Sequence, residues 1–122
     1  MIKLVFCLRR QPGMTLEEFQ AYWREKHAPL VARHAETLRI KRYVQVHTKD
    51  HPLNAALRAT RPGPEPYDGV AELWWDSIED LTAPASTPEG RDASRELLED
   101  EKRFIDLSQS PIWIAEENPV VG

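Results

Sequence analysis

The feature that most constrains this chain is the order in which two kinds of hydrophobic periodicity follow one another. Four short segments alternate apolar and polar residues, and a period of two residues is typical of β-strands. Two longer segments repeat apolar residues every three or four positions, which is typical of helices that pack on one face. The strand-like segments are residues 2–10, 39–49, 67–76 and 111–116, and the helix-like segments are residues 15–34 and 88–107.

This order, β-α-β-β-α-β, is the arrangement of the ferredoxin-like fold. The sequence therefore predicts an α+β protein with a four-stranded antiparallel sheet and two helices on one face of it. A chain of 122 residues has room for one such unit and little more. We expect residues 1–122 to form a single domain.

The first predicted helix begins with a capping box and is interrupted by a proline. The Thr15 hydroxyl can accept a hydrogen bond from the amide of Glu18, whose side chain reaches back to the amide of Thr15. His27 follows on the same apolar stripe as Trp23. Because Pro29 lacks a backbone N–H and disfavours helical dihedrals in the residue before it, we expect a kink or a restart just after His27.

Several predicted strands carry apolar residues on both faces, although helices would cover only one face. In residues 2–8, for example, Leu4 and Phe6 share one face, and Val5 and Cys7 share the other. A large apolar sheet face is unfavourable in water, and a second subunit is its simplest cover. The pattern predicts a homodimer.

Residues 50–66 interrupt the periodic pattern with four prolines and a glycine. We interpret this segment as a long loop around a helical turn at residues 54–59. Long loops in small domains are often functional, so the segment is also a candidate lid.

Charge and cysteine content argue against several classes of protein. Sixteen Lys and Arg against 20 Asp and Glu give a net charge of −4, whereas binding to nucleic acid needs a basic surface. The single cysteine, Cys7, excludes an internal disulfide and fits a reducing compartment. No apolar run approaches the roughly 18 residues of a transmembrane helix. We expect a cytoplasmic protein with no nucleic-acid or membrane partner.

Four side chains are candidates for acid–base catalysis. His27 ends an apolar stripe, where a partly buried imidazole can exchange protons near neutral pH. Tyr43 and His47 project from one face of a single predicted strand. Glu72 lies between apolar neighbours on its own strand face, a setting that suits a general acid or base. Each has a structural alternative. For His27 it is a core histidine bonded to a backbone carbonyl, for the strand face of Tyr43 and His47 it is a solvated sheet edge, and for Glu72 it is a surface charge.

Aromatic side chains are candidates for the walls of a site that binds a flat hydrophobic molecule, although aromatic residues more often form the core. These residues are Tyr22, Trp23, Trp75, Phe104 and Trp113. The chain has no HxH or HExxH spacing, no phosphate-binding glycine loop and no dinucleotide-binding fingerprint. We therefore expect neither a metal nor a cofactor.

Longer motifs carry a family resemblance. The segments YWREKHAPL (residues 22–30), RYVQVH (residues 42–47) and DGVAELWW (residues 68–75) resemble the EthD domain family, which belongs to the dimeric α+β-barrel proteins. The resemblance covers nearly the whole chain and is weakest in residues 50–66. It implies a ferredoxin-like subunit whose sheet pairs with a second copy to close a barrel. It also implies a pocket between the sheet and the helices of each subunit.

The resemblance implies three functions to weigh. Relatives and fold cousins include cofactor-independent dehydratases, lactone isomerases and polyketide cyclases, and the founding member accompanies a cytochrome P450 system that degrades an ether. Our first hypothesis is a cofactor-independent acid–base enzyme acting on a cyclic or aromatic, ketide- or lactone-like small molecule. The alternatives are a non-catalytic accessory protein that binds small molecules in an oxygenase pathway, and a cofactor-free monooxygenase.

The first hypothesis assigns a role to each candidate side chain. His27 would be the general base that removes a proton next to a carbonyl group. Tyr43 or His47 would stabilise the resulting enolate oxygen, and Glu72 would orient a histidine or return the proton. Aromatic walls would hold the substrate and exclude water.

Overall fold

The computed structural model describes residues 1–122 and contains one four-stranded sheet. Its strands are β1 (Ile2–Leu8), β2 (Arg42–His47), β3 (Gly69–Trp75) and β4 (Ile112–Ala115). Their order across the sheet is β2-β3-β1-β4, and every neighbouring pair is antiparallel. This strand order, with the helices between the strands, is the ferredoxin-like α+β fold that the sequence predicts, so that prediction is confirmed.

The first helical segment consists of three consecutive pieces: α1 (Leu16–Tyr22), a π-helical turn (Trp23–His27) and α2 (Ala28–His34). The predicted capping box starts it. The Thr15 hydroxyl accepts the Glu18 N–H at 3.0 Å, and the Glu18 carboxylate accepts the Thr15 N–H at 2.8 Å.

The interruption predicted near Pro29 takes the form of the π-helical turn. The Ala28 N–H donates to the carbonyl of Trp23, five residues earlier, and the helix continues as α2. The extra residue in this turn shifts the hydrogen-bond ladder just before the proline that cannot take part in it. The turn also places Trp23 and His27 on its buried side.

The second helical region begins with α4 (Ile78–Thr82), passes through a 3₁₀ turn and continues as α5 (Pro88–Glu101). We predicted that this helix would end at Leu107, which is wrong. The chain turns after Glu101 so that Phe104 and Ile105 both enter the core, while the Gln11 N–H donates to the Phe104 carbonyl at 2.9 Å.

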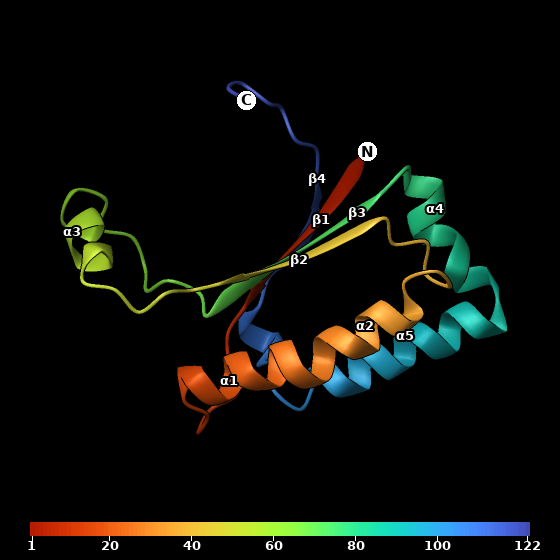
Figure 1. Ribbon diagram of the computed structural model, residues 1–122, viewed down its shortest axis with the longest axis horizontal. Coiled ribbons are helices and arrows are strands. Elements are labelled where there is room, and N and C mark those ends of the chain that lie inside the picture. The colour runs from red at the N-terminus through yellow and green to blue at the C-terminus, as the bar shows by residue number, and fades with distance from the viewer.

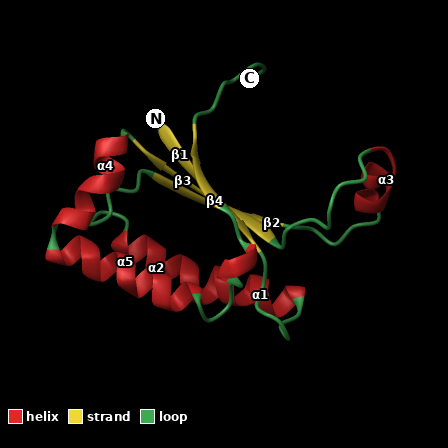
Figure 2. Ribbon diagram, turned by 180° about the vertical axis from the view of Figure 1, so that it is seen from behind, coloured by secondary structure: helices red, strands yellow, loops and turns green.

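The continuous segment of α1 and α2 lies beside α5 on one side of the sheet (Figures 1 and 2). The core fills the space between these two layers, and its largest fully buried side chains are aromatic. The buried core cluster comprises Phe6, Leu8, Phe19, Trp23, Ala71, Phe104 and Ile105. None of the helices is both long enough and apolar enough to cross a membrane.

Strand register decides which residues share a face of the sheet. Leu4, Leu73 and Tyr43 are neighbours across three strands, and their face packs against the helical layer. We call the other side of the sheet the open face, because no helix covers it (Figure 1). It carries Lys3, Val5, Cys7, Arg42, Val44, Val46, Val70, Glu72, Trp74 and Trp113.

Residues 50–66 form an arm that projects beyond the end of the sheet (Figures 1 and 2). The predicted turn at residues 54–59 lies within a longer helix, α3 (Leu53–Thr60), none of whose residues is buried. The Arg9 guanidinium holds the base of the arm by donating to the carbonyls of Glu65 and Pro66, at 2.9 and 2.6 Å.

Candidate active site

A small cavity lies between the sheet and the helical layer. Its volume is about 60 Å³, space for on the order of two water molecules, whereas pockets that hold small ligands are usually roughly 300–1,000 Å³. Three polar side chains, His27, Tyr43 and Glu101, reach it. The rest of its wall is apolar and comprises Phe6, Leu8, Trp23, Val31, Ala71, Leu73, Leu97 and Ile105.

His27 ends the π-helical turn and is only 5% exposed. Its Nδ1 lies 2.7 Å from Oδ2 of Asp100, and its ring centroid lies 5.1 Å from that of Phe104. Burial lowers the pKa of His27, although the Asp100 carboxylate acts in the opposite direction, so the ring is neutral at pH 7. Nε2 has no hydrogen-bond partner in the protein and is the nitrogen left for a bound molecule.

Asp100, in α5, holds His27 in place. Its carboxylate accepts the Tyr22 hydroxyl at 2.6 Å and pairs with His27 at 2.7 Å, and Arg103 approaches to 3.4 Å. Burial acts to raise the pKa of Asp100, but the hydrogen bonds from Tyr22 and His27 outweigh it and lower the pKa. An ionised Asp100 fixes the proton of the neutral imidazole on Nδ1, so Nε2 keeps a free lone pair. His27 is thus a core histidine bonded to a carboxylate, not to a backbone carbonyl.

Tyr43 reaches the cavity from β2, and Gln45 orients it. The Gln45 amide donates to the Tyr43 phenol oxygen at 2.8 Å and to the Trp23 carbonyl at 3.0 Å. The phenol proton is not used in the bond from Gln45, so it is available to an oxygen atom in the cavity. Burial raises the pKa of Tyr43, which keeps the phenol protonated at neutral pH.

His47 lies on the same strand face but does not reach the cavity. Its Nε2 lies 2.8 Å from the side-chain oxygen of Gln45, and its ring packs on Trp23 with centroids 4.5 Å apart. Gly69, its partner on β3, makes this packing feasible, because a Cβ atom there would collide with the Trp23 ring. The structure therefore places His47 behind Trp23, as a neighbour of the cavity wall.

Glu101 is a third polar group of the cavity, next to Asp100 at the end of α5. Its carboxyl group makes no hydrogen bond or ion pair with the protein, in contrast to that of Asp100. Burial, together with the negative charge of Asp100, raises the pKa of Glu101 to about 7.

Asp100 and Glu101 are the functional candidates that sequence reasoning missed. The signal that could have found them is the stripe of α5 and its extension, on which Leu97 and Phe104 are seven residues apart and face inward. Positions 100 and 101 fall between them on that stripe. A carboxylate within an apolar stripe requires a partner or an altered pKa. Here Asp100 has the partners, and Glu101 has the raised pKa.

The predicted aromatic wall is only partly present. Trp23 lines the cavity, and Tyr22 acts through Asp100. Phe104 is fully buried in the core beneath His27. Trp75 is buried away from the cavity, with its indole N–H donating to the Leu38 carbonyl at 2.8 Å.

Two predicted site residues, Glu72 and Trp113, lie on the open face. Glu72 pairs with Lys3 at 3.0 Å, and Trp113 is 46% exposed. Successive side chains of a strand point to opposite faces, so both are separated from His27 by the sheet. Within a single subunit, Glu72 therefore does not reach His27, either to orient it or to return a proton to its cavity.

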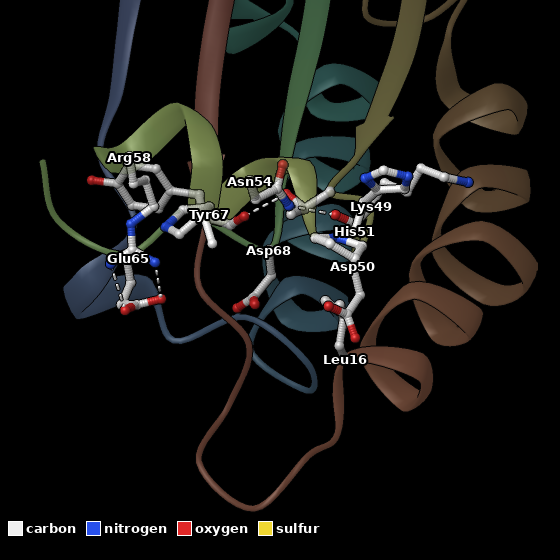
Figure 3. Close-up of a pocket in the computed structure, with 13 residues that line it drawn as sticks. Leu16, Lys49, Asp50, His51, Asn54, Arg58, Glu65, Tyr67 and Asp68 are labelled. Carbon is white, nitrogen blue, oxygen red and sulfur yellow. Dashed lines mark hydrogen bonds and ion pairs between the residues drawn. The ribbon is translucent and has the colours of Figure 1, made fainter. Parts of the chain in front are cut away.

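A larger cleft of about 620 Å³ lies beneath the arm (Figure 3). Its wall is mostly polar. Within it Arg58 pairs with Glu65, and Asp68 pairs with Arg10 from outside the wall, each at 2.8 Å. No residue of the His27 cavity lines it. The arm therefore covers this outer cleft and not the cavity. No three His, Cys, Asp or Glu side chains gather anywhere as a metal-binding group.

Comparison with known proteins agrees with this architecture. The family model of the EthD domain matches residues 11–108. A comparison with curated protein sequences found no match. Among solved structures, an ethyl tert-butyl ether d (EthD) family protein from Bacillus halodurans is 19% identical with a TM-score of 0.62, over 97% of this chain and 100% of that chain.

Two further solved structures share the fold at lower identity. A dimeric protein of unknown function and ferredoxin-like fold from Bacteroides fragilis is 13% identical, with a TM-score of 0.58 over 95% of each chain. A mutant of SnoaB, a cofactor-independent oxygenase from Streptomyces nogalater, is 12% identical, with a TM-score of 0.57 over 98% of this chain and 95% of that chain. At such identities the likeness extends to the fold alone.

Proposed function

The chain belongs to the EthD domain family, and from this premise we propose that it is a cofactor-independent acid–base enzyme of the dehydratase, isomerase or cyclase type. Its substrate is a cyclic or aromatic, ketide- or lactone-like small molecule. The observation that carries the proposal is the Asp100–His27 pair, with Nδ1 held at 2.7 Å and Nε2 unpartnered beside an apolar cavity. A carboxylate, an oriented imidazole and an enclosed cavity are the parts needed to remove a proton from carbon.

His27 is the general base of this proposal. Its lowered pKa keeps Nε2 unprotonated at neutral pH, and Asp100 stabilises the imidazolium ion that forms when Nε2 takes a proton. Tyr43 supplies the second interaction, because its phenol proton can bond to the oxygen on which negative charge develops. Tyr22 and Gln45 position these two groups.

A bound ring needs more room than the cavity has. Its polar groups lie at the wall, and most of the remaining lining is aliphatic. Aliphatic side chains such as Val31, Leu73 and Leu97 can change rotamer at modest cost, so we expect the cavity to widen when substrate enters. The three polar side chains of the cavity wall then fix the orientation of the ring relative to Nε2 of His27.

We also propose that the protein is a homodimer joined through the open face. Val44, Val46 and Val70 form an apolar area there, and Trp74 and Trp113 flank it. Lys3 and Glu72 on this face pair at 3.0 Å, so they can be buried at lower cost than single charges, and the Arg42 guanidinium lies 4.8 Å from the centroid of the Trp74 ring.

The second candidate function is a binding or accessory protein for hydrophobic metabolites. The observation that favours it is the largely apolar cavity wall, which suffices for a carrier. A carrier has no need for an oriented imidazole, so loss of His27 separates the two functions.

The test follows a small cyclic ketone, cyclohex-3-enone. Wild-type protein should accelerate exchange of the hydrogens next to its carbonyl group with D₂O, measured by NMR. His27→Ala should reduce that acceleration roughly a hundredfold or more, the usual scale for a lost general base. Oxygen uptake in the same sample would instead indicate a monooxygenase.

The matched control is His34→Ala. His34 lies further along the same helical segment and pairs with Glu96 at 2.8 Å, outside the cavity. It should keep the wild-type exchange rate. A folded His27→Ala protein that exchanges the probe at the wild-type rate would contradict the acid–base function and leave the carrier function.

A further inference from the structure

Asp100 and Glu101 are consecutive residues with different surroundings. Asp100 points to the first helical segment, where Tyr22 and His27 bind its carboxylate at 2.6 and 2.7 Å. Glu101 is the next residue of α5 and lines the cavity together with His27. One carboxylate therefore holds Nδ1 of His27, and a second carboxyl group, without a partner in the protein, lines the same cavity.

The Glu101 carboxyl group has no cation to neutralise it. The groups that face it are His27 from the π-helical turn, Tyr43 from β2 and Asp100 on its own helix. Two of these are neutral at pH 7 and the third is negative, and the remaining wall is apolar. Such surroundings favour the protonated carboxylic acid, which raises the pKa of Glu101 to about 7.

We propose that Glu101 is a second proton-transfer residue of the site, which gives its proton to the reaction intermediate after His27 has removed one from the substrate. This inference rests on the proposed acid–base function and adds the group that completes it. It also narrows the reaction, because two separate proton carriers suit a reaction in which one atom loses a proton and a different atom gains one.

In an isomerisation, the two residues would move protons as follows, with no net gain or loss of protons. In a β,γ-unsaturated ketone, Nε2 of His27 removes a proton from the carbon between the carbonyl group and the C=C bond, the C–H electron pair enters a dienolate, and Tyr43 bonds to its oxygen. The dienolate electrons re-form the carbonyl group, the C=C bond moves into conjugation with it, and the far carbon of the former C=C bond takes the proton of Glu101. The imidazolium proton of His27 passes to the Glu101 carboxylate, directly or through water, and both groups return to their starting states.

The first arm of the test measures protonation without any substrate. Carbon-13 NMR of the side-chain carboxyl groups should show Glu101 titrating near pH 7 in the wild-type protein. Titration of Glu101 in the ordinary carboxylate range, near 4.3, would overturn the inference, because a carboxylate has no proton to give at neutral pH.

The second arm separates the two carriers with cyclohex-3-enone. Exchange of the hydrogens next to its carbonyl needs only the base, whereas conversion to conjugated cyclohex-2-enone, followed by absorbance, also needs delivery of a proton to another carbon. Glu101→Gln should slow conversion roughly tenfold to a hundredfold, and it should slow conversion more than it slows exchange. The control Glu99→Gln should leave both rates unchanged.

The outcomes distinguish failure of this inference from failure of the proposed function. If Glu101→Gln converts the probe at the wild-type rate while His27→Ala loses exchange, Glu101 is no proton donor and His27 remains the base. If His27→Ala keeps both rates, or the wild-type protein neither exchanges nor converts the probe, the proposed function fails and this inference fails with it.

Discussion

The two faces of the sheet carry similar residue types in opposite settings. On the open face, Glu72 lies 3.0 Å from Lys3, and Glu117 accepts the indole N–H of Trp74 at 2.8 Å. On the covered side of the sheet, Glu101 of α5 lines the cavity and makes no hydrogen bond or ion pair with the protein. A carboxylate beside a cation stays ionised, whereas one enclosed without a cation tends to take up a proton.

Trp23 and Trp113 also differ, although Trp74 of the open face is buried, with Lys3 and Arg42 over its ring. Trp23 is 1% exposed, packs against the core and lines the cavity, whereas Trp113 is nearly half exposed. We therefore assign catalysis to the covered side of the sheet and dimerisation to the open face. The following substitutions test that division.

The largest effect should come from the covered face, with Asp100→Asn. Asparagine keeps the size of the side chain but cannot hold the proton of His27 on Nδ1 by charge, so Nε2 loses basicity. We expect exchange of the cyclohex-3-enone hydrogens to fall roughly a hundredfold or more, with the protein still folded by circular dichroism. Full activity in a folded Asp100→Asn protein would show that catalysis does not depend on the covered side of the sheet.

The next effect concerns the open face. Trp113→Glu should weaken the dimer about a hundredfold by sedimentation velocity, because a truncated aromatic anchor typically costs at least about 2 kcal/mol of association. Leu98→Glu on α5, where Leu98 is 43% exposed against 46% for Trp113, is the matched control and should stay dimeric. Equal behaviour of the two variants would mean that the open face is not the interface.

The third effect is the pH dependence of stability. The pKa of Glu101 is about 7 in the folded protein and 4.5 as an ordinary carboxyl group, so the folded state binds more protons between these values. Its contribution to the free energy of unfolding is therefore present below pH 4.5 and lost as the pH rises through 7. His27 and Asp100 act in the opposite direction, because the pKa of each is lowered.

Glu101→Gln isolates this contribution. Glutamine stays neutral at all pH values, so the variant should match the wild type near pH 4 and exceed its stability by about 3 kcal/mol at pH 8, at roughly 1.4 kcal/mol per pKa unit. Urea unfolding at the two pH values measures the difference, with Glu99→Gln as the control. A variant less stable than the wild type at pH 8 would show that Glu101 is charged and stabilised in the cavity.

Local features of the fold were predictable from the sequence because they depend on near neighbours. The capping box at Thr15 and the altered helix before Pro29 involve contacts within a few residues. The Asp100–His27 pair joins residues 73 positions apart, and no local pattern specifies such a contact. The apolar stripe of α5 indicates that Glu101 faces inward, but only the packing of α5 on the sheet shows which groups surround it.

The face of Glu72 was ambiguous for a different reason. Its neighbours along β3 are apolar on both sides, with Ala71 and Leu73 toward the helices and Val70 and Trp74 on the open face. Alternation shows which residues share a face, but here it does not show which face is covered. The helical layer settles the question, because it packs against the face of Tyr43 and Leu73 and leaves the face of Glu72 uncovered (Figure 1).

The smallest effect should come from Glu72→Gln, and it is the sharpest test of the division between the faces. The variant removes a negative charge from the partly exposed pair with Lys3, whose side chain also lies 3.6 Å from Glu117 and can keep that partner. We expect the free energy of unfolding to change by about 0–1 kcal/mol. Because the sheet separates Glu72 from Nε2 of His27, probe exchange should stay within about twofold of wild type. A loss comparable to that of Asp100→Asn would mean that the open face also contributes to catalysis, and that the site is built from two subunits.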